Sequence, residues 1–255
     1  MKTVFGLLLA IFIFSIPVNA QYLIKSPYLQ NPEKAIDYVD SCAKFWLNTY
    51  DDSRDGFFTY IDKYGNATDT SKNVLTQTRN AYGFVRAYML TGDITYLSMA
   101  RKGLDFMYRY AWDSTYGGWY RELDVNGIPT DRYGDKITFD QLYAILGISA
   151  YYEATADTGD FQWLMDGYDY NENFLWDNRP IYLGYYDTAD FDGSNGRDKS
   201  FNATVDAITT HMLYLYLLTE DEVYKIRLEE LADQIINHLV ASMDFQAIGF
   251  VEKYD

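Results

Sequence analysis

Two aspartates and one arginine are the residues of this 255-residue chain best placed for acid–base chemistry. Asp140 and Asp206 lie near the starts of two segments with helical periodicity, and Arg79 lies near the start of a third. A carboxylate pair can serve as general acid and general base, and an arginine can bind the oxygens of a polar ligand. With aromatic side chains around it, such a set suits a polyol such as a sugar. The alternative is that Asp140 and Thr204 only cap their helices, which these residue types commonly do.

Polar residues recur in register at the starts of these three segments, in steps of 64 residues. The recurring positions are Thr76, Asp140 and Thr204, then Gln77 and Gln141, then Thr78 and Asp206. We therefore expect these side chains to gather at one end of a set of neighbouring helices.

A repeated seven-residue pattern indicates which structural elements position these polar side chains. It reads Gly, aromatic, aromatic or Val, three variable residues, Asp. Its copies begin at Gly56, Gly118, Gly184 and Gly249, with spacings of 62, 66 and 65 residues. A repeat of this size indicates one supersecondary unit used several times, with neighbours covering each other's apolar faces. Since the fourth copy ends at Asp255, we expect the N-terminal part of a longer array, which would self-associate if truncated.

Each repeat reads as a helix, a Gly/Asp-rich turn with a short aromatic hairpin, and a second helix. The first helices are expected over 32–50, 94–110, 161–174 and 221–243, and the second helices over 71–90, 136–154 and 200–218. A tetratricopeptide-type solenoid has a period of ~34 residues and no hairpin between its helices, so the longer period favours a closed toroid. Six pairs would need roughly 380 residues at this period. We therefore predict an all-α fold of (α/α)6-toroid type, with about three and a half of its six pairs present.

The N-terminus has the features of an export signal. Lys2 precedes the apolar run 4–16, and Val18-Asn19-Ala20 is typical of a cleavage site. A membrane anchor is the less favoured alternative, because about 13 apolar residues are short for a ~30 Å hydrocarbon core. We therefore expect residues 1–20 to be a signal peptide, residues 21–255 to form the barrel part, and the protein to be secreted or periplasmic.

Composition narrows the range of ligands. Without Lys2 the chain has 20 basic and 37 acidic residues, a net charge of about −17 that disfavours nucleic acid. The only cysteine, Cys42, excludes an intramolecular disulfide and is expected to be a packed apolar residue. His211 and His238 are the only histidines, too few for a His-rich metal site. The loop 187–198 lacks the Gly and Glu of a calcium loop, so neither a metal nor a cofactor is expected.

Four motifs, in this order, resemble those of the N-acylglucosamine 2-epimerase family, which includes cellobiose 2-epimerases and mannose isomerases. They are Gln77-Thr78-Arg79-Asn80-Ala81-Tyr82, Tyr116-Gly117-Gly118-Trp119-Tyr120 with Leu123-Asp124, Gln141-Leu142-Tyr143-Ala144, and Lys199-Ser200-Phe201-Asn202. The resemblance covers almost all of 21–255. It implies an (α/α)6 barrel, and cofactor-free proton transfer at C2 beside the C1 carbonyl of a ring-opened sugar. It also implies that Arg79 contacts the sugar. The substrate-binding residues that we predict are Arg79, Gln77, Gln141, Asn202, Trp119, Tyr120 and Tyr82.

The chain departs from the family pattern at the residues that carry protons. Thr204 and Asp206 stand where the family motif has two histidines, and Thr209 stands where it has a glutamate. His211 and His238 are expected to be structural. Asp206 and Asp140 are therefore the candidate catalytic residues. Three hypotheses remain: a divergent epimerase acting on a mono- or oligosaccharide, a glycoside hydrolase or lyase using these carboxylates, and a sugar-binding protein without activity.

Overall fold

The computed structural model describes residues 26–180, 182–240 and 252–254. The chain divides into two compact units, residues 1–37 and 38–255. The described part of the first unit holds α2 (Pro27–Gln30) and the start of α3 (Glu33–Leu47). The expected signal peptide lies outside the described residues. Within those residues, no helix has both the length and the apolar character needed to cross a bilayer.

The second unit is built from helix pairs that repeat along the chain. The first helices are α3, α5 (Ile94–Phe106), α8 (Thr158–Tyr170) and α11 (Glu222–Gln234). The second helices are α4 (Val74–Thr91), α6 (Thr138–Ala144) with α7 (Leu146–Thr155), and α9 (Phe201–Ala207) with α10 (Leu213–Thr219). Four π-helical segments extend or join them: η1 (Met107–Ala111), η2 (Asn171–Leu175), η3 (Ile208–Met212) and η4 (Ile235–Leu239).

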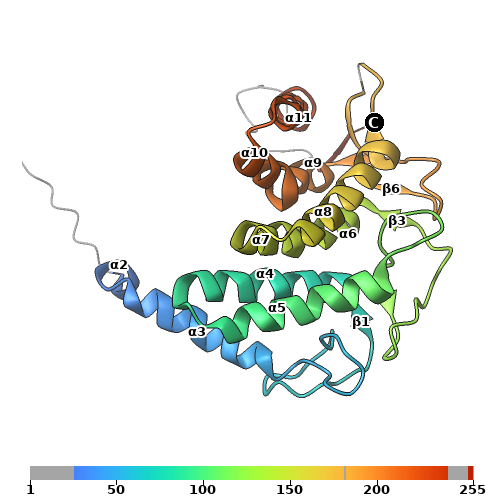
Figure 1. The fold of residues 1–255 in the computed structure, drawn as a ribbon. Helices are drawn as coiled ribbons and strands as arrows, with labels where there is room; N and C mark the ends of the chain where they lie inside the picture. Colours follow the sequence, from blue (N-terminus) through green and yellow to red (C-terminus); the bar gives the residue numbers. More distant parts are fainter. Residues whose placement is uncertain (1–25, 181, 241–251, 255) are drawn as a thin grey trace, which may run out of the picture. The chain divides into compact units, whose positions relative to one another are not determined.

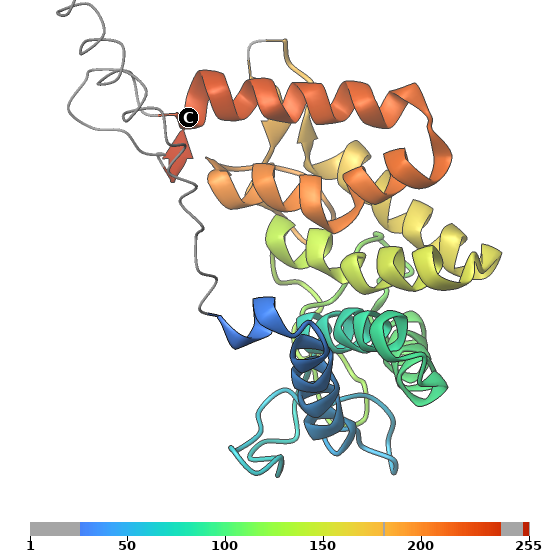
Figure 2. The same cartoon turned by 90° about the vertical axis from the view of Figure 1, so that its left-hand side faces the viewer.

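Successive pairs stack in chain order within this unit (Figures 1 and 2). The second helices contact one another, α4 against α6 and α7, and α7 against α10. The seven predicted helical segments and the all-α class are confirmed, with starts displaced by a few residues. The segment expected over 136–154 divides at Ile145, whose φ of −89° and ψ of −5° end α6. The segment expected over 221–243 is described only as far as Val240.

The turn from each second helix to the next first helix follows one rule. The residue after the helix is left-handed, and the aspartate after it caps the next helix. The left-handed residues are Gly92, Ala156 and Glu220, with φ of 73°, 54° and 57°. The aspartates are Asp93, Asp157 and Asp221, whose side chains accept hydrogen bonds from backbone N–H groups of the first helical turn. These two devices satisfy backbone groups that helix ends leave open.

Short strands occur both within repeats and between them. The first three aromatic hairpins are present as the bridges Tyr50–Phe57 and Trp112–Trp119, and as β4 (Trp176–Asp177) paired with β5 (Gly184–Tyr185). Most of the fourth copy of the pattern, which begins at Gly249, lies outside the described residues. The remaining pairs join neighbouring repeats: β1 (Lys72–Asn73) with β2 (Glu122–Leu123), β3 (Lys136–Ile137) with β6 (Thr188–Ala189), and β7 (Lys199–Ser200) with β8 (Lys253–Tyr254). The residues just before each second helix therefore pair with the hairpin region of the following repeat. The sequence pattern did not predict this pairing.

The Gly-aromatic step of the pattern has a steric cause. The aromatic residues Phe57, Trp119 and Tyr185 are buried in the core. Gly118 has a φ of 73°, and a Cβ there would lie 2.8 Å from both the Gln141 side chain and the Tyr170 ring. Only glycine allows the hairpin to approach the helices closely enough to bury its aromatic residue.

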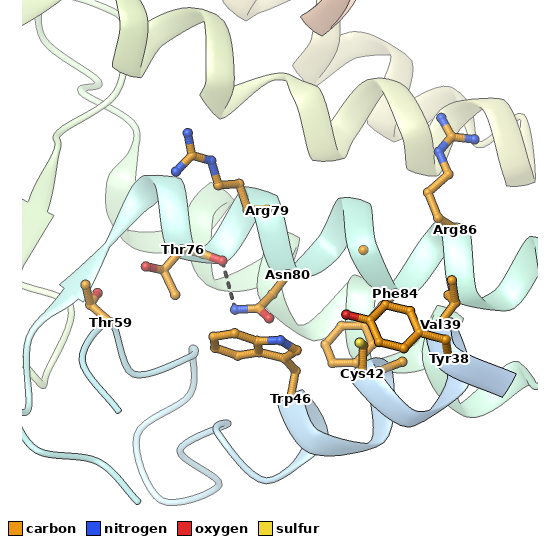
Figure 3. A pocket seen from close by; sticks show the side chains of 12 residues that line it. Tyr38, Val39, Cys42, Trp46, Thr59, Thr76, Arg79, Asn80, Phe84 and Arg86 are labelled. Carbon is orange, nitrogen blue, oxygen red and sulfur yellow. Dashed lines mark hydrogen bonds between the residues drawn. The ribbon is translucent and has the colours of Figure 1, made fainter. Parts of the chain in front are cut away.

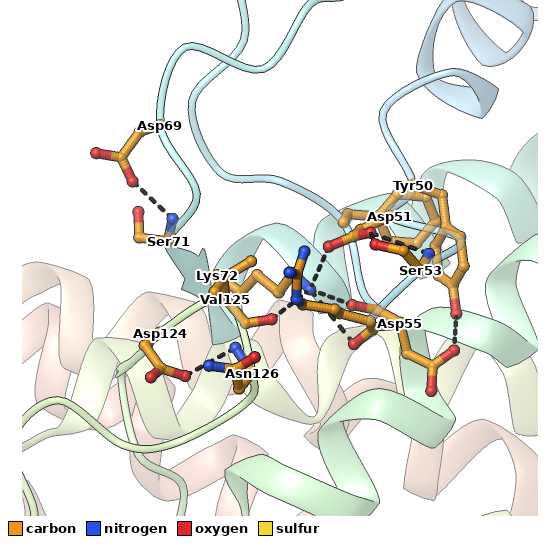
Figure 4. Close-up of polar contacts among 12 residues, drawn as sticks. Tyr50, Asp51, Ser53, Asp55, Asp69, Ser71, Lys72, Asp124, Val125 and Asn126 are labelled. Carbon is orange, nitrogen blue, oxygen red and sulfur yellow. Dashed lines mark hydrogen bonds and ion pairs between the residues drawn. The ribbon is translucent and has the colours of Figure 1, made fainter.

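A buried lysine lies beneath each hairpin and forms an ion pair with an aspartate of the same repeat. The pairs are Lys72–Asp51 at 3.0 Å, Lys136–Asp113 at 3.2 Å and Lys199–Asp177 at 2.7 Å. Lys72 Nζ also donates to the backbone carbonyls of Asp55, Arg54 and Val125, the last at 3.0 Å (Figure 4). Because Val125 belongs to the next repeat, this lysine joins two repeats. The sequence signal that could have identified these pairs is the recurrence of Lys just before each second helix.

Candidate functional site

Arg79 lies on α4 and reaches toward α6. Its guanidinium carbon is 4.6 Å from the centre of the Tyr143 ring and 5.6 Å from that of Phe139. Both rings come from α6, so they form a two-ring shelf on which the guanidinium rests. Arg79 is exposed, and its charge is therefore presented beside this shelf rather than buried in the core.

Asp140 lies between Phe139 and Gln141 in the first turns of α6 and is 2% exposed. Its Oδ2 is 3.4 Å from Arg121 Nε and has no hydrogen-bond partner among the described residues. Burial raises the pKa of Asp140 to about 6, against the opposing charges of Arg121 and Arg79. Its side chain makes no capping hydrogen bond at the start of α6, so capping is not its role.

Asp206 lies on α9 and is half-buried. Its Oδ1 accepts a hydrogen bond from the Tyr143 hydroxyl at 3.5 Å, and its Oδ2 is buried without a hydrogen bond to any described residue. Burial raises the pKa of Asp206, while Tyr143 and the charge of Arg79 oppose that rise. At the start of α9, Ser200 supplies the cap and Thr204 donates to the Ser200 carbonyl, so Thr204 caps nothing.

The structure therefore brings Arg79, Asp140 and Asp206 into one electrostatic cluster. The charge of Arg79 acts on both carboxylates. Each carboxylate keeps one buried oxygen with no hydrogen bond in the described part of the chain. With a pKa of about 6, Asp140 can exchange protons near neutral pH. A neighbouring arginine stabilises negative charge that develops on a ligand.

Two of the predicted ligand contacts are instead part of the scaffold. Gln77 Oε1 accepts from Phe57 N at 2.7 Å and its Nε2 donates to Phe57 O at 2.7 Å. Gln141 makes the same pair of bonds to Trp119, at 2.6 Å and 2.9 Å. Both amides are buried. Each amide is occupied in holding a hairpin in this structure, so ligand binding by Gln77 and Gln141 stays a prediction.

The four remaining predicted contacts lie in different surroundings. Trp119 is 1% exposed and packs against Trp112 and Trp163, so its ring belongs to the core. Tyr120 covers the buried Lys136, whose Nζ is 4.6 Å from its ring centre. Tyr82 lies three residues after Arg79 and is half-buried, with its ring against Arg86.

Asn202 lies near the cluster of Arg79, Asp140 and Asp206. It is exposed at the start of α9 and lines a cavity of about 270 Å³ together with Phe139, the residue beneath Arg79.

A larger cavity of about 470 Å³ lies between α3 and α4 (Figure 3). Arg79, Thr76 and Asn80 line one part of it, and Trp46 and Phe84 line the apolar part. Its volume is in the range of small-molecule sites. Cys42 also lines this cavity and is exposed, so the expectation that it is packed is wrong.

The histidines lie outside the cluster. His211 is fully buried, with Nδ1 2.9 Å from Thr210 Oγ1, and burial lowers its pKa to about 3. This confirms that it packs between helices. His238 is exposed on η4. Among the described residues no group of three or more His, Cys, Asp or Glu side chains is arranged to hold a metal ion.

The pKa of Asp140 gives a testable dependence of stability on pH. Because its folded-state pKa of about 6 exceeds that of an unfolded aspartate, its contribution is complete below about pH 4 and is lost as pH rises through 6. We expect Asp140→Asn to unfold like the wild type at pH 4. At pH 8 it should be more stable by on the order of 2–3 kcal/mol. Urea denaturation at both pH values measures this, with Asp233→Asn on the exposed side of α11 as the control. Equal stability of Asp140→Asn and the wild type at pH 8 would contradict the raised pKa.

Comparison with known proteins identifies a family and several relatives. A model of the family described as N-acylglucosamine 2-epimerase (GlcNAc 2-epimerase) matches residues 56–254. The cellobiose 2-epimerase of Ruminococcus albus is 32% identical over 123 residues, which are 48% of this chain and 31% of that enzyme. The cellobiose 2-epimerase of Eubacterium cellulosolvens is 31% identical over 118 residues, 46% of this chain and 29% of that enzyme. The matches thus span about a third of the length of these relatives.

Solved structures agree on the fold. A D-mannose isomerase superposes with a TM-score of 0.78 at 20% identity, over 91% of this chain and 59% of that one. The cellobiose 2-epimerase of Spirochaeta thermophila gives a TM-score of 0.74 at 19% identity, over 84% and 56%. A family 76 α-mannanase of Bacteroides thetaiotaomicron gives 0.66 at 19% identity, over 84% and 58%. Likeness at this identity establishes the fold, which is of the (α/α)6-toroid type.

Proposed function

The chain belongs to the N-acylglucosamine 2-epimerase family, and on that premise we propose that it is a carbohydrate epimerase or isomerase acting at C2 of a mono- or oligosaccharide. One observation carries the proposal beyond the family. Arg79 rests on two aromatic rings, and its charge acts on two carboxylates whose pKa values are raised. Such a cluster offers an anchor for sugar oxygens beside groups that exchange protons.

In the proposed reaction the sugar is in its open form, with an aldehyde at C1. Asp206, as the carboxylate, takes the proton from C2, and the electron pair of the C2–H bond moves to form an enediolate across C1 and C2. Arg79 stabilises the negative charge on the enediolate oxygen. Return of a proton to the opposite face of C2, from Asp140 in its protonated form, yields the epimer. Return to C1, with transfer of the hydroxyl proton from O2 to O1, yields the ketose.

The raised pKa values suit these roles. A general acid or base works best when its pKa lies near the pH of the reaction. At a pKa of about 6, Asp140 is present in both protonation states near neutral pH, which an ordinary surface aspartate is not. Thr204 and Asp206 stand in place of the family's two histidines, and the carboxylates of Asp206 and Asp140 are then the groups that carry protons.

Product analysis in deuterated water tests the proposal. We expect incubation with mannose or cellobiose to yield an isomer of the sugar that carries deuterium at C2 or, for a ketose, at C1. Proton NMR of the product measures this, and Asp206→Asn should abolish the incorporation. Unchanged sugars with no deuterium, in a protein that binds them, would support the non-catalytic hypothesis instead.

A glycoside hydrolase is the second candidate, favoured by the buried Asp140. A carboxyl with a pKa near 6 is what a glycosidase uses to protonate its leaving group, with a second carboxylate as base or nucleophile. The test is release of reducing ends from α-mannan. Shortened glycans without deuterium at C2 would assign this activity and exclude the epimerase.

Replacement of Arg79 is expected to weaken sugar binding without changing the stability of the fold. We expect Arg79→Ala to weaken sugar binding or raise KM by about 10- to 100-fold, because a charged hydrogen bond contributes about 1.5–3 kcal/mol. Isothermal titration with the sugar and a thermal melt measure the two properties. The melt should stay almost unchanged, since Arg79 is exposed. The matched control is Arg109→Ala, an exposed arginine paired with Asp55 at 3.0 Å. A large loss of stability in Arg79→Ala would show a structural role.

A further inference from the structure

Tyr143 contacts two of the three cluster residues at once. Its ring lies under the Arg79 guanidinium at 4.6 Å, and its hydroxyl donates to Asp206 Oδ1 at 3.5 Å. Tyr143 belongs to α6, Arg79 to α4 and Asp206 to α9. Tyr143 is half-buried and is not among the predicted site residues. It is therefore the side chain that connects the three helices at the cluster.

We propose that Tyr143 is the positioning residue of this site: its ring fixes Arg79, and its hydroxyl fixes Oδ1 of Asp206, which leaves Oδ2 as the oxygen that accepts the proton. The inference rests on the proposed function for its catalytic consequence. Its structural consequence, the state of Asp206, does not depend on any activity.

The backbone of Tyr143 is itself held in place. Thr78, the residue before Arg79, donates from Oγ1 to the Tyr143 carbonyl at 2.8 Å and accepts from Gly147 N at 2.8 Å. A Cβ at Gly147 would lie 2.6 Å from the Thr78 carbonyl, so α4 and the start of α7 approach closely at this point. Because Thr78 precedes Arg79 directly, its side-chain hydrogen bond to the Tyr143 backbone holds Arg79 near the Tyr143 ring.

The two oxygens of Asp206 are not equivalent. Oδ1 is used by the Tyr143 hydroxyl, and Oδ2 is buried with no hydrogen bond to any described residue. When one oxygen of a carboxylate accepts a hydrogen bond and the other does not, the second oxygen is the one available to accept a proton. Among the described residues, the titratable and charged groups that act on Asp206 are Tyr143 from α6 and Arg79 from α4.

The ring and the hydroxyl of Tyr143 can be tested separately, because Phe139 shares only the first role. Phe139 lies four residues earlier on α6, 4.6 Å from the Tyr143 ring centre, and completes the shelf under Arg79 without a hydroxyl. Tyr143→Phe removes only the hydroxyl. Tyr143→Leu removes both hydroxyl and ring, and Phe139→Leu removes half of the shelf.

We expect Tyr143→Phe to raise the pKa of Asp206 by about 0.5 to 1, since a hydrogen bond to the charged form of a carboxyl lowers its pKa. Carbon-13 NMR titration of labelled aspartate, with Asp206→Asn to assign the signal, measures this without a substrate. The acidic limb of the C2-exchange rate should move by the same amount, with kcat lowered about 3- to 10-fold and KM kept. Phe139→Leu should raise KM and leave the pKa unchanged, and Tyr143→Leu should show both effects.

An unchanged Asp206 titration in Tyr143→Phe would overturn the proposal. So would a loss of exchange in all three variants that only follows their loss of stability. If the titration shifts as expected but the wild type exchanges no deuterium at C2, the positioning role stands and the proposed function fails. The two failures are therefore distinguishable.

Discussion

Asp206→Asn is expected to lower kcat/KM for C2 exchange by about 10²- to 10⁴-fold, the usual contribution of a general base. Asparagine keeps the shape of the side chain and its contact with Tyr143, but it cannot accept the proton. Because Asp206 is half-buried and one of its oxygens makes no hydrogen bond to a described residue, the variant should fold as well as the wild type. Single-turnover exchange followed by NMR, together with a urea melt, measures both quantities.

The matched control is Asp233→Asn on α11, which removes one exposed carboxylate and leaves the net charge of the two variants equal. This control should exchange at the wild-type rate. An Asp206→Asn variant that also keeps the wild-type rate would remove Asp206 from the mechanism. Asp140 would then be left as the only carboxylate of the cluster able to transfer the proton.

The largest effect on stability is expected at Lys72. Lys72→Met should cost about 3–5 kcal/mol, because removing one partner of a buried ion pair leaves the other charge uncompensated. Lys72 is completely buried, and Asp51 and three backbone carbonyls point at its ammonium group. Methionine fills a similar volume but neutralises none of these oxygens. Urea denaturation followed by circular dichroism measures the loss.

Lys102→Met serves as the comparison, since Lys102 is 43% exposed and its contact with Asp52 is 3.4 Å long. Such surface pairs contribute about 0–1 kcal/mol. If Lys72→Met lost no more than Lys102→Met, the buried pair would not be a structural requirement. Adding Asp51→Asn to Lys72→Met should restore part of the loss, because it removes the unpaired charge.

The helices and their junctions could be predicted from the sequence because the signals are local. The threonine and aspartate of Thr91-Gly92-Asp93 recur at the later helix ends around one variable residue. This reflects a left-handed residue followed by a capping aspartate, and both needs arise within a few residues. The pairing of β1 with β2 could not be predicted in this way. Its partners are about 50 residues apart, and two-residue strands have no alternation to read.

The site could be predicted only in part, because residues that recur for structural reasons look the same in the sequence as residues that recur for function. Gln77 and Gln141 recur in register, and they do so because each repeat must hold its own hairpin. Arg79 and Asp206 differ in character from the residues one repeat away: Tyr143 occupies the position of Arg79 one repeat later, and Leu142 lies one repeat before Asp206. In a repeat protein, recurring polar residues serve the scaffold, whereas residues that occur once are the better candidates for chemistry.

The contact from Lys72 to the Val125 carbonyl has a consequence for synthesis on the ribosome. The two residues are 53 positions apart, so the ammonium group of the first repeat obtains its last acceptor only when the second hairpin has emerged. At translation rates of about 5–20 residues per second, the delay is roughly 3–10 s. During that interval the first repeat can close over the ammonium group only with incomplete coordination, which favours its open form. The first repeat of the nascent chain therefore completes its lysine site only after the second hairpin has been synthesised.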